Sequence, residues 1–435
     1  MSLTKATYAM INGAVANVLD YGADPTGVAN SKTAIDLALA AGAGSVYFPN
    51  GTYKYTGQIT IPNGVNIFGA GMYATFINFT YAGYAVIIQG IGSEISDLTM
   101  NCSQEGVKFQ TQPTGVGYTL FNQLTRVKLI GPGRSATYVG RSTHGVLFDK
   151  MTGAGGATYF NTIRDCVITQ FDDGITFDAA AGLASTGGNA NHALNNQIEN
   201  YWNAYNIRSI ENDIRGGFLH AASGSGSDVS TGYRFENGAF NNSVTPATGE
   251  PGLLARCYFA DTGTYSNNID DGAYNYNTPS VDLGLNNINR TYTRPLNQGS
   301  LTENHYYTVP ITTAIPTNSS ATFTLTYASN AVALNSASCG TINIYVYRTT
   351  GAVTVSFYAK NIVTSGAGAI NFTGLYVDGS NVANLVFYAG NNGTASSAGN
   401  LSMNLINTSV GNNFSTYLGG VLTDAGTSDP TTNPA

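Results

Sequence analysis

The sequence predicts an all-β chain: a parallel β-helix with a short N-terminal cap helix, followed by an antiparallel β-sandwich. Three observations predict this fold class. Hydrophobic and small residues recur every 29 residues or so in the first half of the chain, which is typical of stacked supersecondary units. Longer alternating segments replace that period towards the C-terminus. The composition combines 10% charged residues with 52 Gly, which suits the tight turns of a solenoid.

Three rows of residues carry the repeat between Phe79 and Phe235. The first hydrophobic row is Ile88, Phe109, Phe148, Phe177, Ile207 and Phe235. Three positions before these stand only small residues: Ala85, Gly106, Gly145, Gly174, Ala204 and Gly232. The second hydrophobic row is Phe79, Met100, Leu129, Ile168 and Ile198, and the insertion Gly131 to Thr143 accounts for the one long coil. Two short alternating segments per period favour strands over helices.

Charge and cysteine content exclude several function classes. The net charge of -7 and the absence of any Lys/Arg cluster argue against a nucleic-acid partner. The four cysteines form no CxxC pair, so neither a metal site nor a disulfide framework is expected. Cys166 shares a column with Leu98 and Val127, which predicts a buried side chain. With no apolar segment long enough to span a bilayer and no secretion signal, we expect a soluble protein that has no membrane partner and needs no cofactor.

The N-terminal part is expected to supply the cap of the β-helix. Residues 1 to 16 are interpreted as a lead-in, and the strand that follows ends in the turn Asp24-Pro-Thr-Gly. Asn30 or Ser31 can cap a helix over Thr33 to Ala41, with Ile35, Leu37 and Leu39 as its apolar residues. Because the end of a solenoid exposes core and unpaired strand edges, this helix is predicted to cover it.

This N-terminal part also resembles a known family. The segment NVLDYGADPTGVANSKTAIDLALAAG, followed by VYFPNGTYKYTGQITIPNGVNIFGAG, is similar to the start of the pectate-lyase-like right-handed β-helix of phage tailspikes and depolymerases. The resemblance is close over residues 8 to 71 and extends by pattern to about residue 260. It implies a homotrimer on a phage virion tail, alongside other tail proteins, that binds and often cleaves a bacterial surface polysaccharide.

The predicted domains are a β-helix over 17–280, a linker over 281–300, a β-sandwich over 301–424 and a disordered tail over 425–435. The sandwich rests on eight segments whose alternation is that of half-buried strands. These segments are His305–Ile311, Ala321–Tyr327, Thr341–Arg348, Val353–Ile362, Ala369–Val377, Ala383–Tyr388, Leu401–Ile406 and Thr416–Leu422. The sandwich is expected either to trimerise the chain or to bind carbohydrate.

Candidate catalytic residues come from the column that follows the first hydrophobic row: Gln89, Gln110, Asp149, Asp178, Arg208 and Glu236. It is polar in every coil, so it must face outwards. Stacked coils place Asp149 and Asp178 roughly 4.8 Å apart, close to the about 5 to 5.5 Å of retaining glycosidases, while Asp178 and Glu236 approach the upper limit of the inverting spacing. The alternative is a solvated ladder in which Arg208 pairs with Asp178 and Glu236.

Two further columns carry charge. The first reads Tyr84, Glu105, His144, Asp173, Asn203 and Thr231, and Glu105, His144 and Asp173 are interpreted mainly as neutralising one another. Asp172 and Asp173 flank a turn and could join the groove beside Asp178. The second, Asp97, Arg126, Asp165 and Asn195, is interpreted as a salt-bridged ladder.

Saccharide binding also needs flat aromatic faces. Tyr201, Trp202 and Tyr205 lie close together in the sequence, and Trp202 stands at a turn position where it could face outwards as a sugar platform or pack against a loop or trimer neighbour. The insertion with Arg134 and Arg141 is predicted to form a groove wall.

The sequence thus predicts a glycoside hydrolase acting on capsule or O-antigen, with Asp149, Asp178 and Glu236 as its carboxylates. Two alternatives stay open. One is a receptor-binding tail protein that holds a glycan without cutting it. The other is a polysaccharide lyase, which would use a Lys, Arg, His or Tyr base on a uronic acid.

Overall fold

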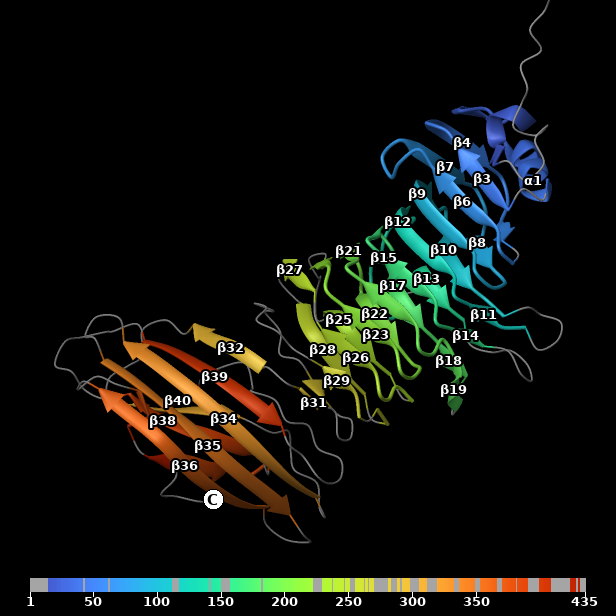
Figure 1. The fold of residues 1–435 in the computed structure, drawn as a ribbon. Coiled ribbons are helices and arrows are strands. Elements are labelled where there is room, and N and C mark those ends of the chain that lie inside the picture. The colour runs from blue at the N-terminus through green and yellow to red at the C-terminus, as the bar shows by residue number, and fades with distance from the viewer. Residues whose placement is uncertain are drawn as a thin grey trace, which may run out of the picture. The chain divides into compact units, whose positions relative to one another are not determined.

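The structure, a computed structural model, describes most of the N-terminal half and the strands of the C-terminal half (Figure 1). The described residues are 15–41, 44–61, 63–111, 117–140, 142–149, 157–180, 183–221, 229–236, 238–245, 247–250, 255–261, 263–264, 266–269, 281–282, 288–289, 292–297, 305–310, 319–331, 336–348, 353–365, 370–380, 382–389, 399–407, 423–427 and 429–430. They form two compact units, Met1–Ala255 and Arg256–Ala435.

The first unit begins with strand β1 (Ala16–Asn17), the 3-10 turn η2 (Val18–Tyr21), strand β2 (Thr26–Asn30) and helix α1 (Lys32–Ala40). The Asp24 carboxylate fixes the turn before β2, because it accepts hydrogen bonds from the Thr26 hydroxyl, the Thr26 N–H and the Ala29 N–H at 2.7–2.9 Å. These bonds lower the pKa of Asp24 to about 2.

Helix α1 is the predicted helix, shifted by one residue. Its buried side chains are Ala34, Ile35 and Ala38, whereas Leu37 is 53% exposed. Of the three apolar residues named from the sequence, Ile35 is therefore in the core and Leu37 is not, since residues 34, 35 and 38 share one helical face and residue 37 lies off it.

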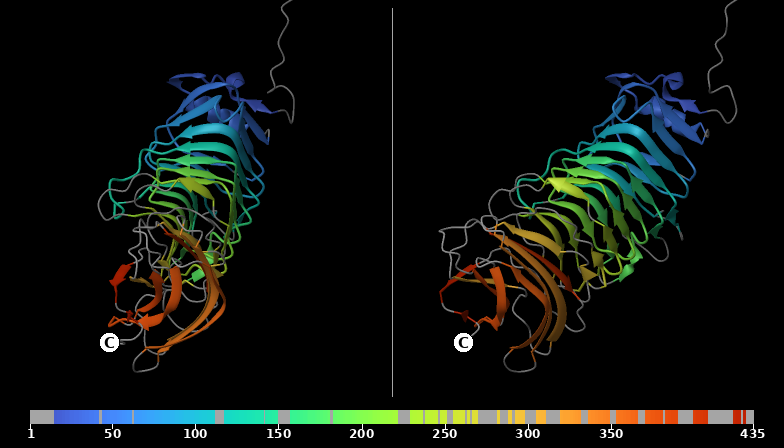
Figure 2. Two further views of the ribbon diagram at one scale, coloured as in Figure 1. Left: turned by 90° about the vertical axis from the view of Figure 1, so that its left-hand side faces the viewer. Right: turned by 60° about the vertical axis from the view of Figure 1, so that its left-hand side comes forward.

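The coils of the first unit contribute strands to two parallel sheets, which the views of Figure 2 show stacked in regular order. Strands of the first sheet in this unit, besides β1 and β2, are β3 (Ser45–Phe48), β4 (Gly51–Tyr55), β6 (Asn66–Gly69), β7 (Thr75–Phe79), β9 (Glu94–Asn101), β12 (Gln123–Ile130), β15 (Thr162–Arg164), β16 (Val167–Thr169), β20 (His192–Leu194), β21 (Gln197–Glu199), β23 (Asp213–Arg215), β24 (Phe218–His220), β26 (Ser243–Thr245) and β27 (Thr248–Glu250).

The second sheet carries the candidate site. Its strands in this unit are, in spatial order, β5 (Ile59–Ile61), β8 (Tyr84–Ile88), β10 (Glu105–Phe109), β13 (His144–Phe148), β17 (Asp173–Phe177), β22 (Asn203–Ile207) and β25 (Ser230–Phe235). Two short pairs accompany the coils: β11 (Thr119–Leu120) with β14 (Thr158–Tyr159), parallel, and β18 (Ala179–Ala180) with β19 (Leu183–Gly187), antiparallel. The fold of this unit is therefore the predicted parallel β-helix.

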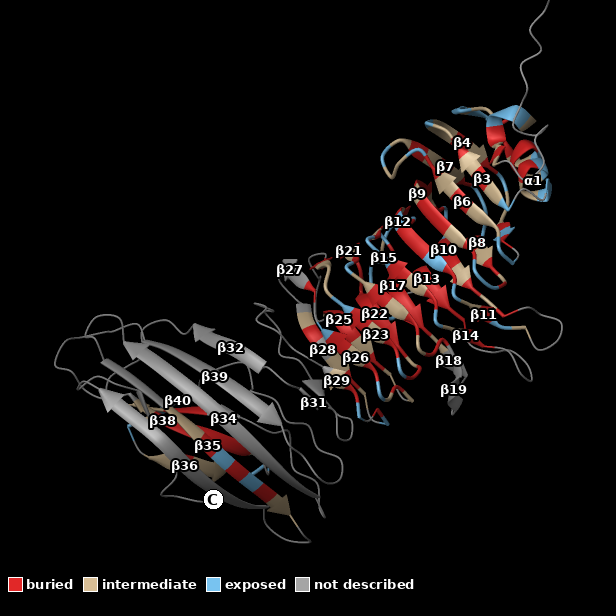
Figure 3. Cartoon of the chain, viewed as in Figure 1, coloured by how far each residue is buried: buried red, intermediate tan, exposed pale blue. Residues whose placement is uncertain are grey.

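Strand register confirms the first hydrophobic row. Each of its six residues is the register partner of the next, and all six are fully buried. Phe109, Phe148 and Phe177 stack with ring centroids 4.7 and 5.0 Å apart. In the second row, Met100 pairs with Ile77 and not with Phe79. The assignment of Phe79 to this row was therefore wrong by two residues. A shift of two residues keeps the same face of the strand inwards. Figure 3 shows the resulting buried stripes.

The corners of the coils depend on two features that recur with the period. Residues with φ near +50 to +60° occupy one corner position, among them Asp97, Arg126, Asp165 and Asn195. At a second corner buried asparagines bond along the stack: the Asn122 amide donates to Asn161 Oδ1 at 2.9 Å, and the Asn161 amide donates to Asn191 Oδ1 at 3.0 Å. This ladder satisfies buried polar backbone without charge.

The second unit contains parallel pairs and two antiparallel sheets. The parallel pairs are β28 (Ala255–Ala260) with β30 (Val281–Asp282) and β29 (Asn268–Ile269) with β31 (Ile288–Asn289). One antiparallel sheet has the order β32 (Tyr292–Asn297), β39 (Gly399–Asn407), β34 (Ser319–Ala331), β35 (Ser336–Arg348), β36 (Val353–Ser365). The other has the order β37 (Ile370–Val377), β38 (Ala383–Ala389), β33 (Tyr306–Pro310), β40 (Thr423–Gly426).

Seven of the eight predicted C-terminal strands coincide with described strands, and the eighth, Thr416–Leu422, lies outside the described residues. The described residues of the predicted linker belong to β30, β31 and β32, and β32 pairs with β39. In the predicted disordered tail, residues 425 and 426 belong to β40. Within the described residues, no helix has the length and apolar character needed to cross a membrane.

Candidate active site

The outward side chains of the second sheet form three columns that run across β8, β10, β13, β17, β22 and β25. The first column is the predicted one from Gln89 to Glu236. The second, or middle, column lies two positions before the first along each strand. Its members are Ile87, Lys108, Leu147, Thr176, Asn206 and Arg234. The third column is the predicted one from Tyr84 to Thr231.

The first column is a continuous ladder of backbone hydrogen bonds. The amides of Asp149, Asp178 and Glu236 donate to the carbonyls of Phe109, Phe148 and Ile207, each at 2.8–2.9 Å. Every member therefore follows a strand that is hydrogen-bonded to the next coil. The prediction that Asp149, Asp178, Arg208 and Glu236 are stacked neighbours is confirmed.

Cations lie against all three predicted catalytic carboxylates. Lys108 Nζ is 2.8 Å from Asp149 Oδ2. Arg208 lies between the other two, with Nε 2.8 Å from Glu236 Oε2 and Nη1 3.5 Å from Asp178 Oδ1. The bridging role of Arg208, which was the alternative considered from the sequence, is present in the structure.

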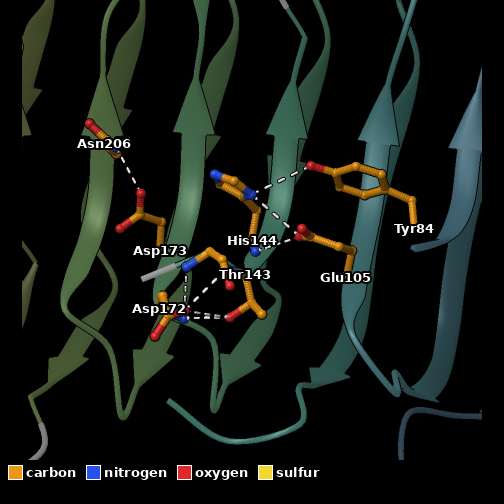
Figure 4. A network of polar contacts seen from close by, with 8 residues as sticks. Tyr84, Glu105, Thr143, His144, Asp172, Asp173 and Asn206 are labelled. Atoms are coloured by element: carbon orange, nitrogen blue, oxygen red, sulfur yellow. Dashed lines mark hydrogen bonds and ion pairs between the residues drawn. The ribbon is translucent and has the colours of Figure 1, made fainter. Parts of the chain in front are cut away.

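His144 is the centre of a polar network on the third column (Figure 4). Its backbone N–H donates to Glu105 Oε2 at 2.7 Å, and its Nδ1 lies 3.3 Å from the same oxygen and 3.4 Å from the Tyr84 hydroxyl. Burial by itself would lower the pKa of His144, but the Glu105 hydrogen bond and the negative charge of Asp173 outweigh it, so the pKa is raised. Burial, with the nearby charges of Glu105 and Asp149, raises the pKa of Tyr84 well above its usual range.

Asp173 faces the same network from the next strand. Its two carboxylate oxygens accept hydrogen bonds from the side-chain amides of Asn203 at 2.7 Å and Asn206 at 2.8 Å. Only 2% of Asp173 is exposed, although it lies on the outer face of the sheet. Asp149 at 6% and Glu105 at 9% are similarly enclosed. The charges of this face therefore act in a partly dry environment, where electrostatic interactions are stronger than in water.

Asp172 has a different role from its neighbour. Its carboxylate accepts hydrogen bonds from the Ser135 N–H and hydroxyl at 2.7 and 2.6 Å, from the Ser142 N–H at 2.7 Å, and from the Thr143 N–H and hydroxyl at 3.1 Å. Burial would raise its pKa, but these bonds lower it. Asp172 therefore anchors both ends of the 131–143 insertion and is not a groove residue as predicted.

The predicted aromatic platform is corrected by the structure. Trp202 and Tyr205 are fully buried and Tyr201 is 1% exposed. The Trp202 indole N–H donates to the Ser135 carbonyl at 3.0 Å, and the Arg134 guanidinium carbon lies 3.7 Å from the centre of the indole ring. The insertion covers Trp202, so Trp202 and Arg134 hold the loop and neither presents a free face to a sugar.

The insertion nonetheless reaches the outer face. The Tyr138 ring lies edge-on to Trp202 at 6.0 Å, and the Arg234 guanidinium carbon is 5.8 Å from the Tyr138 ring centre. Arg234 belongs to the middle column, with Nε 3.7 Å from Glu236 Oε1. The loop thus borders the columns, as a groove wall would; Arg141, the other predicted loop residue, lies outside the described residues.

Sequence reasoning missed Lys108 and gave the Tyr84–Glu105–His144 network only a structural role. Lys108 stands one position before Phe109 in the first hydrophobic row, so strand alternation already placed it outwards. Its ammonium also lies 5.3 Å from the Tyr84 ring centre, which joins the first and third columns. No cluster of three metal-ligating side chains occurs in the part of the chain that the structure describes.

Comparison with known proteins gives a family-model match and several similar proteins. Residues 15–218 match the family model described as rhamnogalacturonase A/epimerase, pectate lyase-like. Mannuronan C5-epimerase AlgE2 of Azotobacter vinelandii is 34% identical over 123 residues, which are 23% of this chain and 12% of that protein. AlgE1 of the same organism is 33% identical over 122 residues, 9% of its length. The chain therefore spans only about a tenth of these relatives.

Solved structures aligned with the chain include two proteins from phage and bacterial sources. The tailspike protein of Acinetobacter baumannii phage AM24 covers 95% of this chain and 84% of its own, at 12% identity and a TM-score of 0.33. Pantoea stewartii WceF, described as a glycan biofilm modifying enzyme with a tailspike-like parallel β-helix fold, covers 93% and 62%, at 14% identity and a TM-score of 0.32. The strand order shows that residues 15–218 form a parallel β-helix, and these are the residues that match the pectate-lyase-like family model.

Proposed function

We propose that this chain is a phage tail protein that binds a bacterial surface polysaccharide on the outer face of β8–β25 and cleaves it by glycoside hydrolysis. The observation that carries the proposal is the stacked carboxylate pair Asp149 and Asp178, each with a cationic neighbour, on a largely enclosed face. The epimerases matched by sequence are named for a polysaccharide substrate, mannuronan, and the family description includes a rhamnogalacturonase. The tail location rests on the resemblance of residues 8 to 71 to tailspikes.

The two carboxylates suit different roles. Asp149 has the shorter ion pair, 2.8 Å to Lys108 against 3.5 Å from Asp178 to Arg208. A close cation favours the ionised carboxylate, so we assign Asp149 as the anion that attacks the sugar or activates water. Asp178, whose cationic neighbour is more distant, is assigned as the group that protonates the glycosidic oxygen, and Glu236 would hold Arg208 in place from the other side.

The first test is reducing-end release from a panel of purified bacterial surface polysaccharides with wild type and Asp178→Asn. We expect one glycan to be cut and the substitution to lower kcat roughly 10²- to 10⁴-fold, with binding retained. Asp165→Asn, on the exposed corner column, is the matched control and should leave kcat unchanged. If a glycan binds and is never cut, the protein is a receptor-binding adhesin, and the hydrolase proposal fails.

A second candidate function is favoured by the Tyr84–His144 contact. A polysaccharide lyase or epimerase removes the C5 proton of a uronic acid and needs an acid, a base and a cation near the sugar carboxylate. Tyr84 keeps its proton because its pKa is raised, so it would be the acid. Neutral His144, 3.4 Å from the Tyr84 hydroxyl and with a raised pKa, would accept the C5 proton and so become the cation. A lyase would release a product with ultraviolet absorbance, which hydrolysis does not give.

We further propose that the active form is a homotrimer in which other tail proteins attach at the N-terminal end. This rests on the tailspike resemblance alone. Sedimentation analysis of the intact chain tests it, and a monomer at micromolar concentration would contradict it.

A further inference from the structure

Four aromatic side chains gather at one corner of the β-helix, on or next to the short parallel pair β11 and β14. Figure 1 labels these two strands. We call this cluster the corner ledge: Tyr118, Phe121, Tyr159 and Phe160. Phe121 is 57% exposed, Phe160 49% and Tyr118 43%. Isolated exposed apolar residues are normal on protein surfaces, but a contiguous group of large ones indicates a contact surface.

The rings of the corner ledge are ordered along the stack of coils. Phe121 and Phe160 are parallel within 11°, with centroids 5.6 Å apart, and Tyr118 and Tyr159 lie 6.4 Å apart. Tyr159 contacts Phe160 at 6.1 Å and so joins the two pairs. The ledge is therefore two rings wide and two coils deep.

The fold does not require aromatic residues at these positions. Phe121 and Phe160 have φ of +58° and +54°, a left-handed conformation that is unfavourable for a bulky side chain. The equivalent positions in neighbouring coils, each two residues before a register-paired residue, are Gly92, Ala190, Glu211 and Asn241, all with positive φ. The corner needs the backbone conformation only, so the two phenylalanines need an explanation other than folding.

The coils on either side leave the outer ring faces open. Gly92 precedes Phe121 in the stack and has no side chain, and Ala190 follows Phe160 with a single methyl group. The stacked pair can therefore present both outer faces and its edges to a ligand. Flat apolar faces beside tyrosine hydroxyls suit the apolar faces and hydroxyl edges of sugar rings.

Two hydrogen bonds connect the strands of the ledge to the candidate active site. The Thr119 hydroxyl donates to the Gln110 carbonyl at 2.7 Å, and the Thr158 hydroxyl donates to the Asp149 carbonyl at 3.4 Å. Both carbonyl residues belong to the first outward column. The ledge thus lies beside strands that are hydrogen-bonded to the second and third members of that column.

The size of the ledge favours a glycan over a protein partner. About half of each of three side chains of roughly 150–250 Å² is exposed, and Ile91 adds a similar share, so the patch offers on the order of 400 Å². A stable protein interface buries about 800 Å² on each partner. A patch of this size matches a few sugar rings.

We propose that the corner ledge is a saccharide-binding subsite that holds the polysaccharide chain beyond the cleaved linkage. The inference rests on the proposed function and adds the residues that bind the chain at a distance from the carboxylates. Long glycans reach both the carboxylate columns and the ledge, and short fragments bind at the columns alone.

The test is the double substitution Phe121→Asn with Phe160→Asn in the full chain. Asparagine tolerates positive φ better than phenylalanine, so the variant should keep or raise the thermal unfolding midpoint. We expect the Kd of a polysaccharide that the wild type binds to rise roughly tenfold or more, while turnover of its shortest cleavable fragment stays unchanged. Tyr73→Asn, an aromatic 71% exposed outside the ledge, is the matched control and should bind the polymer normally.

The outcomes separate this inference from the proposed function. If the double variant binds the polymer as tightly as the wild type, the ledge proposal is wrong and the active-site proposal stands. If the variant changes only the sedimentation of the oligomer, the ledge is covered by a second copy of the chain. If the wild type binds no bacterial surface polysaccharide in the panel, the proposed function fails and the ledge proposal fails with it.

Discussion

Residues of one chemical type perform separate tasks on this surface, as the adjacent carboxylates of Asp172 and Asp173 illustrate. Asp172 accepts five hydrogen bonds from the 131–143 insertion, whereas Asp173 accepts from two asparagine amides in the column that contains His144. The sequence pattern placed both at one turn but could not tell which of them points at a loop, because that depends on how the insertion folds back.

The role of Asp172 predicts an acid-sensitive loop. Its pKa is lowered in the folded state, so its stabilising effect is fully present above the unfolded value of about 3.9 and is lost as the pH falls through the lower folded value. Trp202 is the single tryptophan and packs on the loop, so its emission should shift to the red only at such acid pH.

The variant Asp172→Asn should show the red shift already at neutral pH, because an amide NH₂ group would face the N–H donors of the loop. Trypsin should also cut after Arg134 much faster in this variant. Asp165→Asn, whose carboxylate lies on an exposed corner, is the control. Wild-type emission and cleavage rates in Asp172→Asn would show that the loop does not depend on this carboxylate.

At the scale of the elements, the coils are held in register by side chains that bond along the stack as well as by their strands. Asn161 accepts from the Asn122 N–H and side-chain amide and donates to the Thr119 carbonyl and Asn191 Oδ1, all at 2.9–3.0 Å. It lies one residue after Phe160, so the ladder also fixes the corner that presents the aromatic ledge.

We therefore expect Asn161→Ala to lower the free energy of unfolding by about 3 kcal/mol, because it leaves several buried donors and acceptors without partners, at about 1–3 kcal/mol each. Chemical denaturation of the intact chain measures the change. Asn195→Gly, at an exposed corner with φ of +55°, should change the stability by less than about 0.5 kcal/mol. Equal effects of the two substitutions would contradict a special role for the ladder.

At the scale of the whole molecule, the chain combines a sheet stack built from neighbouring coils with antiparallel sheets that join distant segments. Strand β32 makes six register pairs with β39, more than a hundred residues later in the sequence. The two antiparallel sheets contact each other through β37 with β34 and β35. The C-terminal sandwich therefore begins earlier than the predicted boundary at residue 301.

The pairing of β32 with β39 predicts how the stability of the isolated C-terminal sandwich depends on where the segment starts. We expect a segment that starts at residue 288 to fold more stably and to aggregate more slowly than a segment that starts at residue 301. Without β32, the backbone N–H and C=O groups along one edge of β39 are exposed and can pair with another chain. Light scattering and thermal unfolding compare the two. Removing residues 431–435 from the longer segment is the control truncation, and identical behaviour of the 288 and 301 segments would restore the predicted boundary.

The sequence by itself determined the β-helix, the inward rows, the outward column from Gln89 to Glu236 and most C-terminal strands. It did so because a solenoid repeats one local pattern, so that residues a fixed interval apart in the sequence become neighbours in space. Strand alternation also held enough information to place Lys108 outwards beside that column.

Only the tertiary structure decided what interrupts the repeat. The insertion after β12 buries Trp202 and donates hydrogen bonds to the carboxylate of Asp172. Strand β32 pairs with β39, which lies far along the chain. Such contacts join segments at irregular separations, which no period encodes. The ion pairs were also decided by the tertiary structure. Arg208 bridges Asp178 and Glu236, and Lys108 reaches Asp149. These pairings depend on the direction and burial of the side chains, which position in the column does not determine.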